Sequence, residues 1–360
     1  MAIIKEESKS FPLYFQDGTK NANYASEYGR SLKNLPIGNQ TNTYNQITGI
    51  SSDTEKWWGG VLASNGYIYC APINSSTILK INPNNNTVTE IGSFTNAAYK
   101  YMGGVLAPNG KIYFIPCSAA SVLVLDPSND TTYTFGIGQF TAGTFFWGGG
   151  ALNKEGKKIY CSPSLSIEIL VIDVTNDSCS TFGNVTDVSY KYTSACLAPN
   201  GFIYCFPSYG EKILKINTDL NTFTQVGTVV AGGSKYYSSV LSSDGFIYSL
   251  PNQNTTNIIK FNPITDTFVD IATTAAYING ACLGIDGRIY GAGNGAVYIF
   301  DPLTNITISI SNSTSDNTGM NLALNGKMYT MPRSATSIAV IGDEVQFNKN
   351  LALSRFNNKF

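Results

Sequence analysis

The most informative absence is histidine, which does not occur among the 360 residues. Histidine is the commonest general base and the commonest transition-metal ligand, so catalysis would have to use carboxylates, lysine, tyrosine or cysteine. The carboxylates are scattered, and Asp126, Asp173, Asp301, Asp244 and Asp286 all stand in turn motifs where aspartate caps its own backbone. We therefore predict that the chain is not an enzyme and has no catalytic residues, no metal site and no cofactor.

Charge is also scarce, since only 13% of the residues are charged and the formal net charge is −1. This balance does not favour binding to nucleic acid or to an anionic membrane. No apolar run reaches the length of about 18 residues that a transmembrane helix needs. The first 15 residues, MAIIKEESKSFPLYF, lack the pattern of a signal peptide. We expect neither a membrane segment nor a secretion signal.

The seven cysteines cannot form a complete disulfide framework because their number is odd, and none has the CxxC spacing of a metal site. Cys70, Cys161 and Cys205 occupy one repeat position directly after an Ile-Tyr pair, which predicts small buried apolar side chains. Cys196 and Cys205 flank an Asn-Gly turn at 200–201. A cross-strand disulfide between these two residues is the alternative.

A sequence repeat is the strongest positive feature. GGVLAPNGKIYFIP (103–116) recurs in related forms, and the anchoring glycines are Gly66, Gly110, Gly156, Gly201, Gly245, Gly287 and Gly326. Their spacings of 44, 46, 45, 44, 42 and 39 residues are typical of the four-stranded blades of a β-propeller. The chain therefore contains seven copies.

Each copy predicts four strands. The first ends in Asn-Gly or Asp-Gly, a strong hairpin signal. The second contains Ile-Tyr and mostly ends at proline, the third is leucine-rich and β-branched, and the fourth alternates with threonine on one face. The seventh copy lacks a clear fourth strand, whereas NTYNQITG (42–49) has that pattern before the first copy. We predict that 42–49 closes the ring, and closure by EVQF (344–347) is the alternative.

We therefore predict an all-β fold, a single seven-bladed β-propeller with four-stranded antiparallel blades over residues 41–346. Residues 1–40 form an N-terminal arm and 347–360 a C-terminal tail. The motifs LAPNGKIYFIP and SVLVLDP resemble the YVTN-type β-propeller repeat, and the resemblance extends over about 42–346. It implies the fold, whereas proteins of this type serve as adhesins, scaffolds and occasional enzymes. Seven-bladed lyases that inactivate streptogramins depend on histidine, and the Ser-X-Asp-X-Gly-X-X-Trp box of sialidases is absent.

A lysine followed by an aromatic residue recurs where the chain enters the first strand of a blade. Propellers usually bind ligands on this face. Because side chains alternate along a strand, we expect the lysine and the first aromatic to face a ligand, while Trp58, Trp147 and Tyr237 pack between blades. A ring of lysines and aromatics could stack sugars or hold a carboxylate-bearing glycan; solvated decoration without a ligand is the alternative. The candidate ligand-binding residues are Lys56, Trp57, Lys100, Tyr101, Lys191, Tyr192, Lys235 and Tyr236.

The two ends of the chain contain apolar residues that have no core of their own. Either they are ring-hugging ends, or they dock the propeller onto other subunits of a larger assembly. The candidate docking residues are Phe11, Leu13, Tyr14, Phe15, Phe356 and Phe360.

Together these features favour a binding or scaffolding protein. The first hypothesis is a structural or host-recognition protein of a virion, associated with a phage tail or a capsid, located on the virion or an extracellular surface. The second is a lectin-like propeller that binds a cell-surface glycan through its lysines and aromatics. The third is an enzyme with a site in the central channel.

Overall fold

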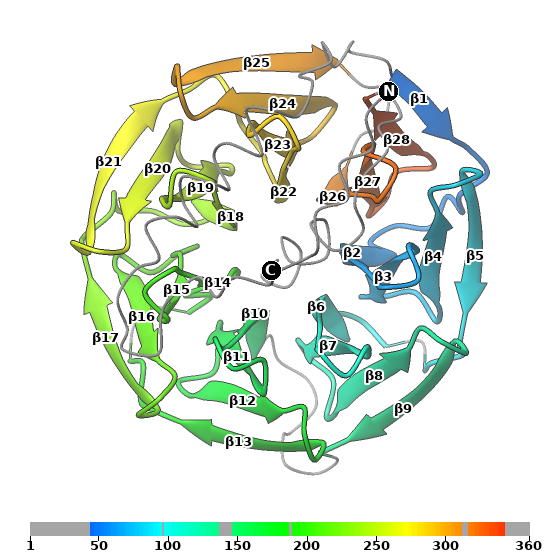
Figure 1. Ribbon diagram of the computed structural model, residues 1–360, viewed down its shortest axis with the longest axis horizontal. Helices are drawn as coiled ribbons and strands as arrows, with labels where there is room; N and C mark the ends of the chain where they lie inside the picture. Colours follow the sequence, from blue (N-terminus) through cyan, green and yellow to red (C-terminus); the bar gives the residue numbers. More distant parts are fainter. Residues whose placement is uncertain (1–43, 96, 137–145, 187–188, 312–315, 343–360) are drawn as a thin grey trace, which may run out of the picture.

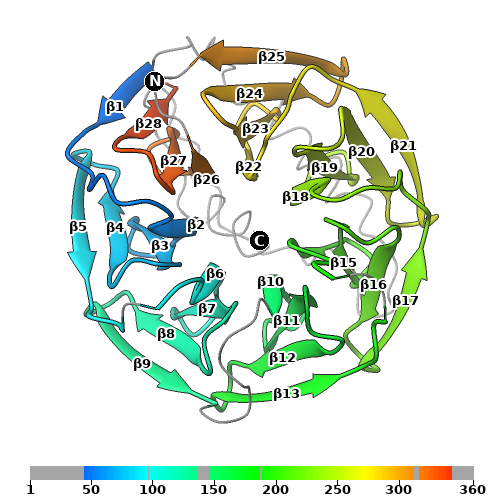
Figure 2. The same ribbon diagram turned by 180° about the vertical axis from the view of Figure 1, so that it is seen from behind.

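The computed structural model describes residues 44–342 except 96, 137–145, 187–188 and 312–315. The described residues form seven separate four-stranded sheets, all antiparallel, arranged in a ring (Figure 1). The view from behind shows the same order from inner to outer strand in each blade (Figure 2). The predicted all-β seven-bladed propeller is therefore confirmed.

The first four blades follow the chain, and each runs from the inner strand to the outer strand. Blade 1 contains β2 (Trp57–Leu62), β3 (Ile68–Pro72), β4 (Ile78–Asn82) and β5 (Thr87–Ile91). Blade 2 contains β6 (Tyr101–Leu106), β7 (Ile112–Pro116), β8 (Val122–Asp126) and β9 (Thr131–Phe135). Blade 3 contains β10 (Trp147–Leu152), β11 (Lys158–Pro163), β12 (Ile169–Asp173) and β13 (Ser178–Phe182). Blade 4 contains β14 (Cys196–Leu197), β15 (Ile203–Cys205), β16 (Ile213–Asn217) and β17 (Thr222–Val226).

The remaining blades include the one that closes the ring. Blade 5 contains β18 (Tyr236–Leu241), β19 (Ile247–Pro251), β20 (Asn257–Asn262) and β21 (Thr267–Ala272). Blade 6 contains β22 (Gly280–Leu283), β23 (Ile289–Ala292), β24 (Ala296–Asp301) and β25 (Ile306–Ser311). Blade 7 contains β26 (Asn317–Leu322), β27 (Met328–Pro332), β28 (Ile338–Ile341) and, as its outer strand, β1 (Tyr44–Ile47).

Strand β1 closes the ring from the N-terminal side. It pairs antiparallel with β28, from Tyr44 opposite Ile341 to Ile47 opposite Ile338. The predicted closure by 42–49 is confirmed, and the alternative closure by 344–347 is wrong because β1 already occupies the outer edge of β28. Two segments almost 300 residues apart in the sequence thus share one sheet.

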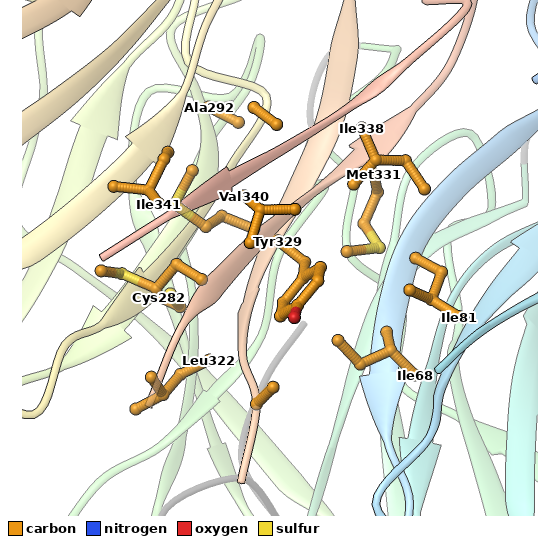
Figure 3. Packing of buried hydrophobic residues seen from close by; sticks show 14 of the residues in the cluster. Ile68, Ile81, Cys282, Ala292, Leu322, Tyr329, Met331, Ile338, Val340 and Ile341 are labelled. Carbon is orange, nitrogen blue, oxygen red and sulfur yellow. The ribbon is translucent and has the colours of Figure 1, made fainter. Parts of the chain in front are cut away.

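The core at this closure joins three blades. Ile68 and Ile81 of blade 1 and Cys282 and Ala292 of blade 6 lie in one apolar cluster with Tyr329 of blade 7 (Figure 3). All five side chains are buried, so blade 7 is packed on both of its faces. Burial of this kind contributes about 25 cal/mol for each Å² of apolar surface removed from water.

The inner strands approach one another too closely for side chains at some positions. A Cβ atom added to Gly280 would lie 2.5 Å from the backbone Cα of Gly319 in the next blade. At Gly148 the added atom would lie 2.8 Å from the Cα of Thr193. The glycines at the start of the inner strands are thus needed for the close approach of neighbouring blades.

A repeated set of hydrogen bonds joins blades on the face that carries the hairpin turns, which we call the turn face. Between blades 2 and 3, the Asn109 amide donates to Tyr113 at 2.9 Å and to the Val174 carbonyl at 3.1 Å. The Tyr113 hydroxyl donates to Asp177 at 2.8 Å. The same set, which we call the blade clamp, recurs around Asn65, Asn200 and Asn325.

The cysteines form no disulfide among the described residues, which include all seven. Cys70, Cys161 and Cys205 are buried, as predicted. The alternative disulfide between Cys196 and Cys205 is wrong. The hairpin register pairs Cys196 with Tyr204, so Cys205 projects from the other face of the sheet and lies in a different apolar cluster.

The predicted arm (1–40) and the whole of the predicted tail (347–360) lie outside the described residues, as do the six candidate docking residues from Phe11 to Phe360. The docking role of the two ends therefore stays a prediction. In the described part of the chain, no helix has the length and apolar character needed to cross a membrane.

Candidate functional site

The candidate site lies on the face opposite the turns, where the inner strands begin. This loop face carries the connections from each outer strand to the next blade and the loops between second and third strands. All eight predicted ligand-binding residues lie at the edge of this face. Their side chains are nevertheless buried, with Lys56, Lys191 and Lys235 at most 2% exposed and Lys100 5% exposed.

The lysines hold the incoming loops. Lys56 Nζ donates to the carbonyl of Asp53 at 2.6 Å, and Lys100 Nζ donates to that of Ala97 at 2.9 Å. Lys235 Nζ donates to the carbonyl of Gly232, again three residues earlier. Burial lowers the pKa of Lys56 and lowers that of Lys100 to about 8. The prediction that these lysines face a ligand is therefore wrong, because their side chains are buried.

The first aromatic of each pair fills a core instead of facing a ligand. Trp57 is 1% exposed, lies in the cluster at the ring closure and donates its Nε1–H to the carbonyl of Thr77 at 2.7 Å. Tyr101, Tyr192 and Tyr236 are buried in the corresponding clusters of their blades. The prediction that the side chain at this position points outward is wrong. The residue pairs with the proline that ends the second strand, and in this register its side chain points into the core.

The second aromatic has the complementary orientation. Trp58 and Tyr237, which we expected to pack between blades, are only half-buried. Trp58 does pack against the small apolar cluster of Ile73, Met102 and Cys117, which joins blades 1 and 2. Trp147 is buried as expected, but it pairs with Pro163 as Trp57 pairs with Pro72, so it is structurally a first-position residue. The alternation along the strand is therefore present, and the aromatic that reaches solvent is the second one.

The sequence analysis missed three tyrosines. Each lies one residue before the position that the buried lysines occupy in other blades or in its own. Tyr99, Tyr190 and Tyr277 have φ angles of 54°, 56° and 57°, a left-handed conformation that is uncommon for large residues. Tyr190 is 40% exposed and Tyr277 is 49% exposed. The recurrence of tyrosine at this position in AAYK, SYK and AAYI was the available signal.

Tyr190 belongs to a cluster at the seam between blades 4 and 5. Its ring centroid lies 5.8 Å from that of Tyr209, at an interplanar angle of 48°. The Ser234 hydroxyl donates to the Tyr209 hydroxyl at 3.3 Å and lies 3.1 Å from that of Tyr237. We call Tyr190, Tyr209, Ser234 and Tyr237 the tyrosine cluster.

The backbone beneath this cluster accommodates the ring of Tyr209. A Cβ atom added to Gly233 would lie 2.1 Å from that ring, so only glycine allows the ring to rest there. Tyr209 remains 41% exposed. The cluster thus presents exposed aromatic rings together with four hydroxyl groups on a packed support.

A second group on the loop face consists of charges that are paired with one another, although Arg333 Nε has no hydrogen-bond partner among the described residues. Arg333 donates to Glu55, its Nη1 lies 3.4 Å from Asp316, and its guanidinium lies 5.4 Å from the ring centroid of Trp58. The Tyr99 hydroxyl donates to Glu55 at 2.9 Å. Burial raises the pKa of Glu55, but the bonds from Tyr99 and Arg333 outweigh it and lower the pKa. These charges join blades 7, 1 and 2.

The aspartates of the turn motifs have the structural roles that we predicted. Asp126 accepts the Ser128 backbone N–H at 2.9 Å, and Asp173 and Asp301 accept equivalent bonds in their own turns. Asp244 and Asp286 accept the N–H groups of Phe246 and Arg288. Among the described residues, no three histidine, cysteine, aspartate or glutamate side chains are placed to hold a metal ion.

Comparisons with known proteins identify the fold. No protein-family model and no curated protein matches the chain. A solved streptogramin B lyase is 11% identical with a TM-score of 0.70, over 84% of this chain and 98% of the lyase. A catalytically inactive histidine-to-alanine variant of virginiamycin B lyase from Staphylococcus aureus, solved with quinupristin, is 12% identical with a TM-score of 0.69, over 83% and 99% of the chains. The extracellular domain of a one-component system from B. thetaiotaomicron is 11% identical with a TM-score of 0.65, over 84% of this chain and 40% of the other.

These likenesses overturn the prediction that the chain is not an enzyme. That prediction excluded catalysis because histidine and a recognisable catalytic constellation are absent. Solved proteins with this seven-bladed fold include lyases, so the fold is compatible with enzymatic activity. At identities of 11–12% the likenesses otherwise show the fold alone.

Proposed function

We propose that this chain is a recognition propeller that binds a glycan through the tyrosine cluster on its loop face. The observation that supports the proposal is the pair of exposed rings, Tyr190 and Tyr209, beside the hydroxyls of Ser234 and Tyr237. Exposed aromatic rings supply contact area at a low cost in conformational entropy, and their hydroxyl groups add directional hydrogen bonds. Sugars offer the matching surface, with apolar C–H faces edged by hydroxyl groups.

The scarcity of charge supports an uncharged ligand. Only 13% of the residues are charged, and the lysines near the loop face bond to backbone carbonyls inside the protein. The arginine of the loop face is paired with Glu55 and Asp316. A carboxylate-bearing glycan would find no cation in the tyrosine cluster, so we propose a neutral one.

The biological setting that we propose is a virion, with a phage-tail or capsid-associated position, or another extracellular surface. The surface rich in Asn, Ser and Thr and the apolar chain ends support this setting, and the ends would dock onto other subunits. The likeness of the fold to an extracellular bacterial domain is compatible with it. The repeat motif supports membership of the YVTN-type propellers.

Glycan binding is tested by replacing Tyr209 with alanine and screening wild type and variant on an array of neutral and acidic glycans. We expect wild type to bind neutral glycans and Tyr209→Ala to bind at least about tenfold more weakly, because the stacking surface is lost. Tyr209→Phe keeps the ring and removes the hydroxyl, so we expect an intermediate loss.

Tyr277→Ala is the matched control, because Tyr277 is similarly exposed on the same face but lies outside the cluster. It should bind like wild type. Absence of glycan binding by wild type, or equal losses in Tyr277→Ala and Tyr209→Ala, would overturn the proposal. Thermal melts establish that each variant is folded.

A further inference from the structure

Among the described outer strands, that of blade 6 is the one with isoleucine at both of two equivalent exposed positions, whereas β21 has a single apolar residue there, Val269. In blade 1, Thr87 and Thr89 occupy the two exposed positions that pair with Asn82 and Lys80. The equivalent positions of β25 pair with Asp301 and Ile299, and they carry Ile306 and Ile308. Ile306 is 59% exposed and Ile308 is 45% exposed. Hydroxyl groups have thus been replaced by apolar side chains.

Within the described part of the chain, this strand is also a free edge. The sheet order of blade 6 is β22-β23-β24-β25, and β25 has no strand partner on its outer side among the described residues. It lies on the perimeter of the ring (Figure 1). Soluble proteins usually protect such edges with charge, proline or a bulge. The six residues of β25, ITISIS, contain none of these protections.

The sequence of β25 is complementary to itself in an antiparallel arrangement. If two copies pair about Ile308, then Ile306 faces Ile310 of the second strand, Thr307 faces Ser309, and Ile308 faces its own copy. All isoleucines would then share one side of the joined sheet and the hydroxyls the other. Cross-strand pairs of β-branched residues stabilise a sheet, and no like charges oppose each other here.

The orientation of the strand within its own blade agrees with this pairing. The Thr307 hydroxyl lies 2.7 Å from that of Thr273, so that side of β25 faces blade 5. Ile310 packs against the cluster at the ring closure. Leu303 in the preceding turn is 89% exposed and extends the apolar surface.

We propose that two copies of this chain associate through β25, about a two-fold axis at Ile308, and form a continuous eight-stranded sheet. A two-fold contact is isologous, so the same strand serves both partners. One strand and a neighbouring turn make a small interface, and such interfaces are typical of weak complexes. The dimer should therefore depend on concentration in the micromolar range.

Sedimentation of the full chain over a range of concentrations tests the proposal. Wild type should shift from monomer to dimer, and Ile308→Lys should stay monomeric because it places two lysines opposite each other at the axis. Thr89→Lys, at the equivalent position of blade 1, should dimerise like wild type. Melting curves establish that the lysine variants are folded. Ile308→Thr restores the residue type of blade 1 and should weaken the dimer at least about tenfold.

A covalent trap distinguishes the proposed register from other contacts. Ile308→Cys should form a disulfide-linked dimer under mild oxidation, since residue 308 faces its own copy, whereas Thr89→Cys should not. A wild type that remains monomeric at every concentration would overturn the proposal. A dimer that persists in Ile308→Lys, or a trap equally efficient at position 89, would also overturn it.

Discussion

The choice between asparagine and aspartate in the hairpin turns decides whether a blade is fastened to the next one. An asparagine amide can donate to a carbonyl of the following blade, as Asn109 does to Val174. A carboxylate cannot donate, and Asp244 and Asp286 accept the hydroxyls of tyrosines in their own blades instead, at 2.7 and 2.8 Å. The seams after blades 5 and 6 therefore lack the donor that characterises the blade clamp. The seam after blade 3 lacks it too, because Glu155 occupies the turn position and Tyr160 alone bonds to Thr218 and Asn221.

We predict that Asn109→Asp lowers the free energy of unfolding by about 1–3 kcal/mol, because the Val174 carbonyl loses its shorter hydrogen bond and keeps only the one from Tyr113 at 3.4 Å, and because a second carboxylate is placed near Asp177. Chemical denaturation measures the change. Asn84→Asp introduces the same charge at an exposed turn position and should change stability by less than about 0.5 kcal/mol. Equal losses in the two variants would contradict a role for the clamp.

The element with the largest structural consequence for its length is β1. Its four residues cover the outer edge of β28, and Ile47 contributes to the apolar cluster that joins blades 6, 7 and 1. Without this strand, blade 7 would have three strands and an exposed edge. The two neighbouring blades would also lose part of a shared core.

We predict that deletion of residues 41–50 lowers the melting temperature and promotes aggregation, because it opens the edge of β28. Calorimetry and light scattering measure both effects. Deletion of 1–40 should leave the melting temperature within a few degrees of wild type, because β1 and its pairing remain. A ring that melts normally without 41–50 would show that β1 is dispensable for closure.

For the whole molecule, the repeated tyrosine of the second strand links stability to alkaline pH. Burial raises the pKa of Tyr160 to about 12, and it raises the pKa of Tyr69, Tyr113 and Tyr204 further. In the unfolded chain these hydroxyls ionise near pH 10. Their contribution is therefore complete below pH 10 and is lost as the pH rises above it.

Lys100 has the opposite effect on stability, and it acts at a lower pH than the tyrosines. Its pKa of about 8 in the folded protein lies below the usual 10.5, so the folded state loses this proton first and gains stability between these values. We predict a stability that rises slightly from pH 8 and falls steeply above pH 10. Thermal melts against pH, with tyrosinate absorbance followed in parallel, test this. Tyrosine ionisation without unfolding at pH 11 would contradict the prediction.

Much of the fold could be predicted because its determinants are local and repeated. The Asn-Gly turn at 65–66 requires a positive φ, which Gly66 adopts at 85°, and the spacing of seven such turns defines seven blades. The missing fourth strand of the last copy and the extra strand pattern at 42–49 then determined how the ring closes. Each of these signals depends on neighbours within a few residues or on a simple count.

The candidate site depended on contacts between blades, and these the sequence alone could not settle. Side chains alternate along a strand, but the sequence pattern does not say which alternate set is buried. Pairing with Pro72 and packing against the neighbouring core place the Trp57 side chain inside. Burial of the lysines followed from loop carbonyls that needed a donor. Tyr190, Tyr209 and Tyr237 come from different segments and meet only where blades 4 and 5 pack together. The sequence by itself thus determined the ring and its closure, whereas the tertiary structure decided which side chains reach the surface.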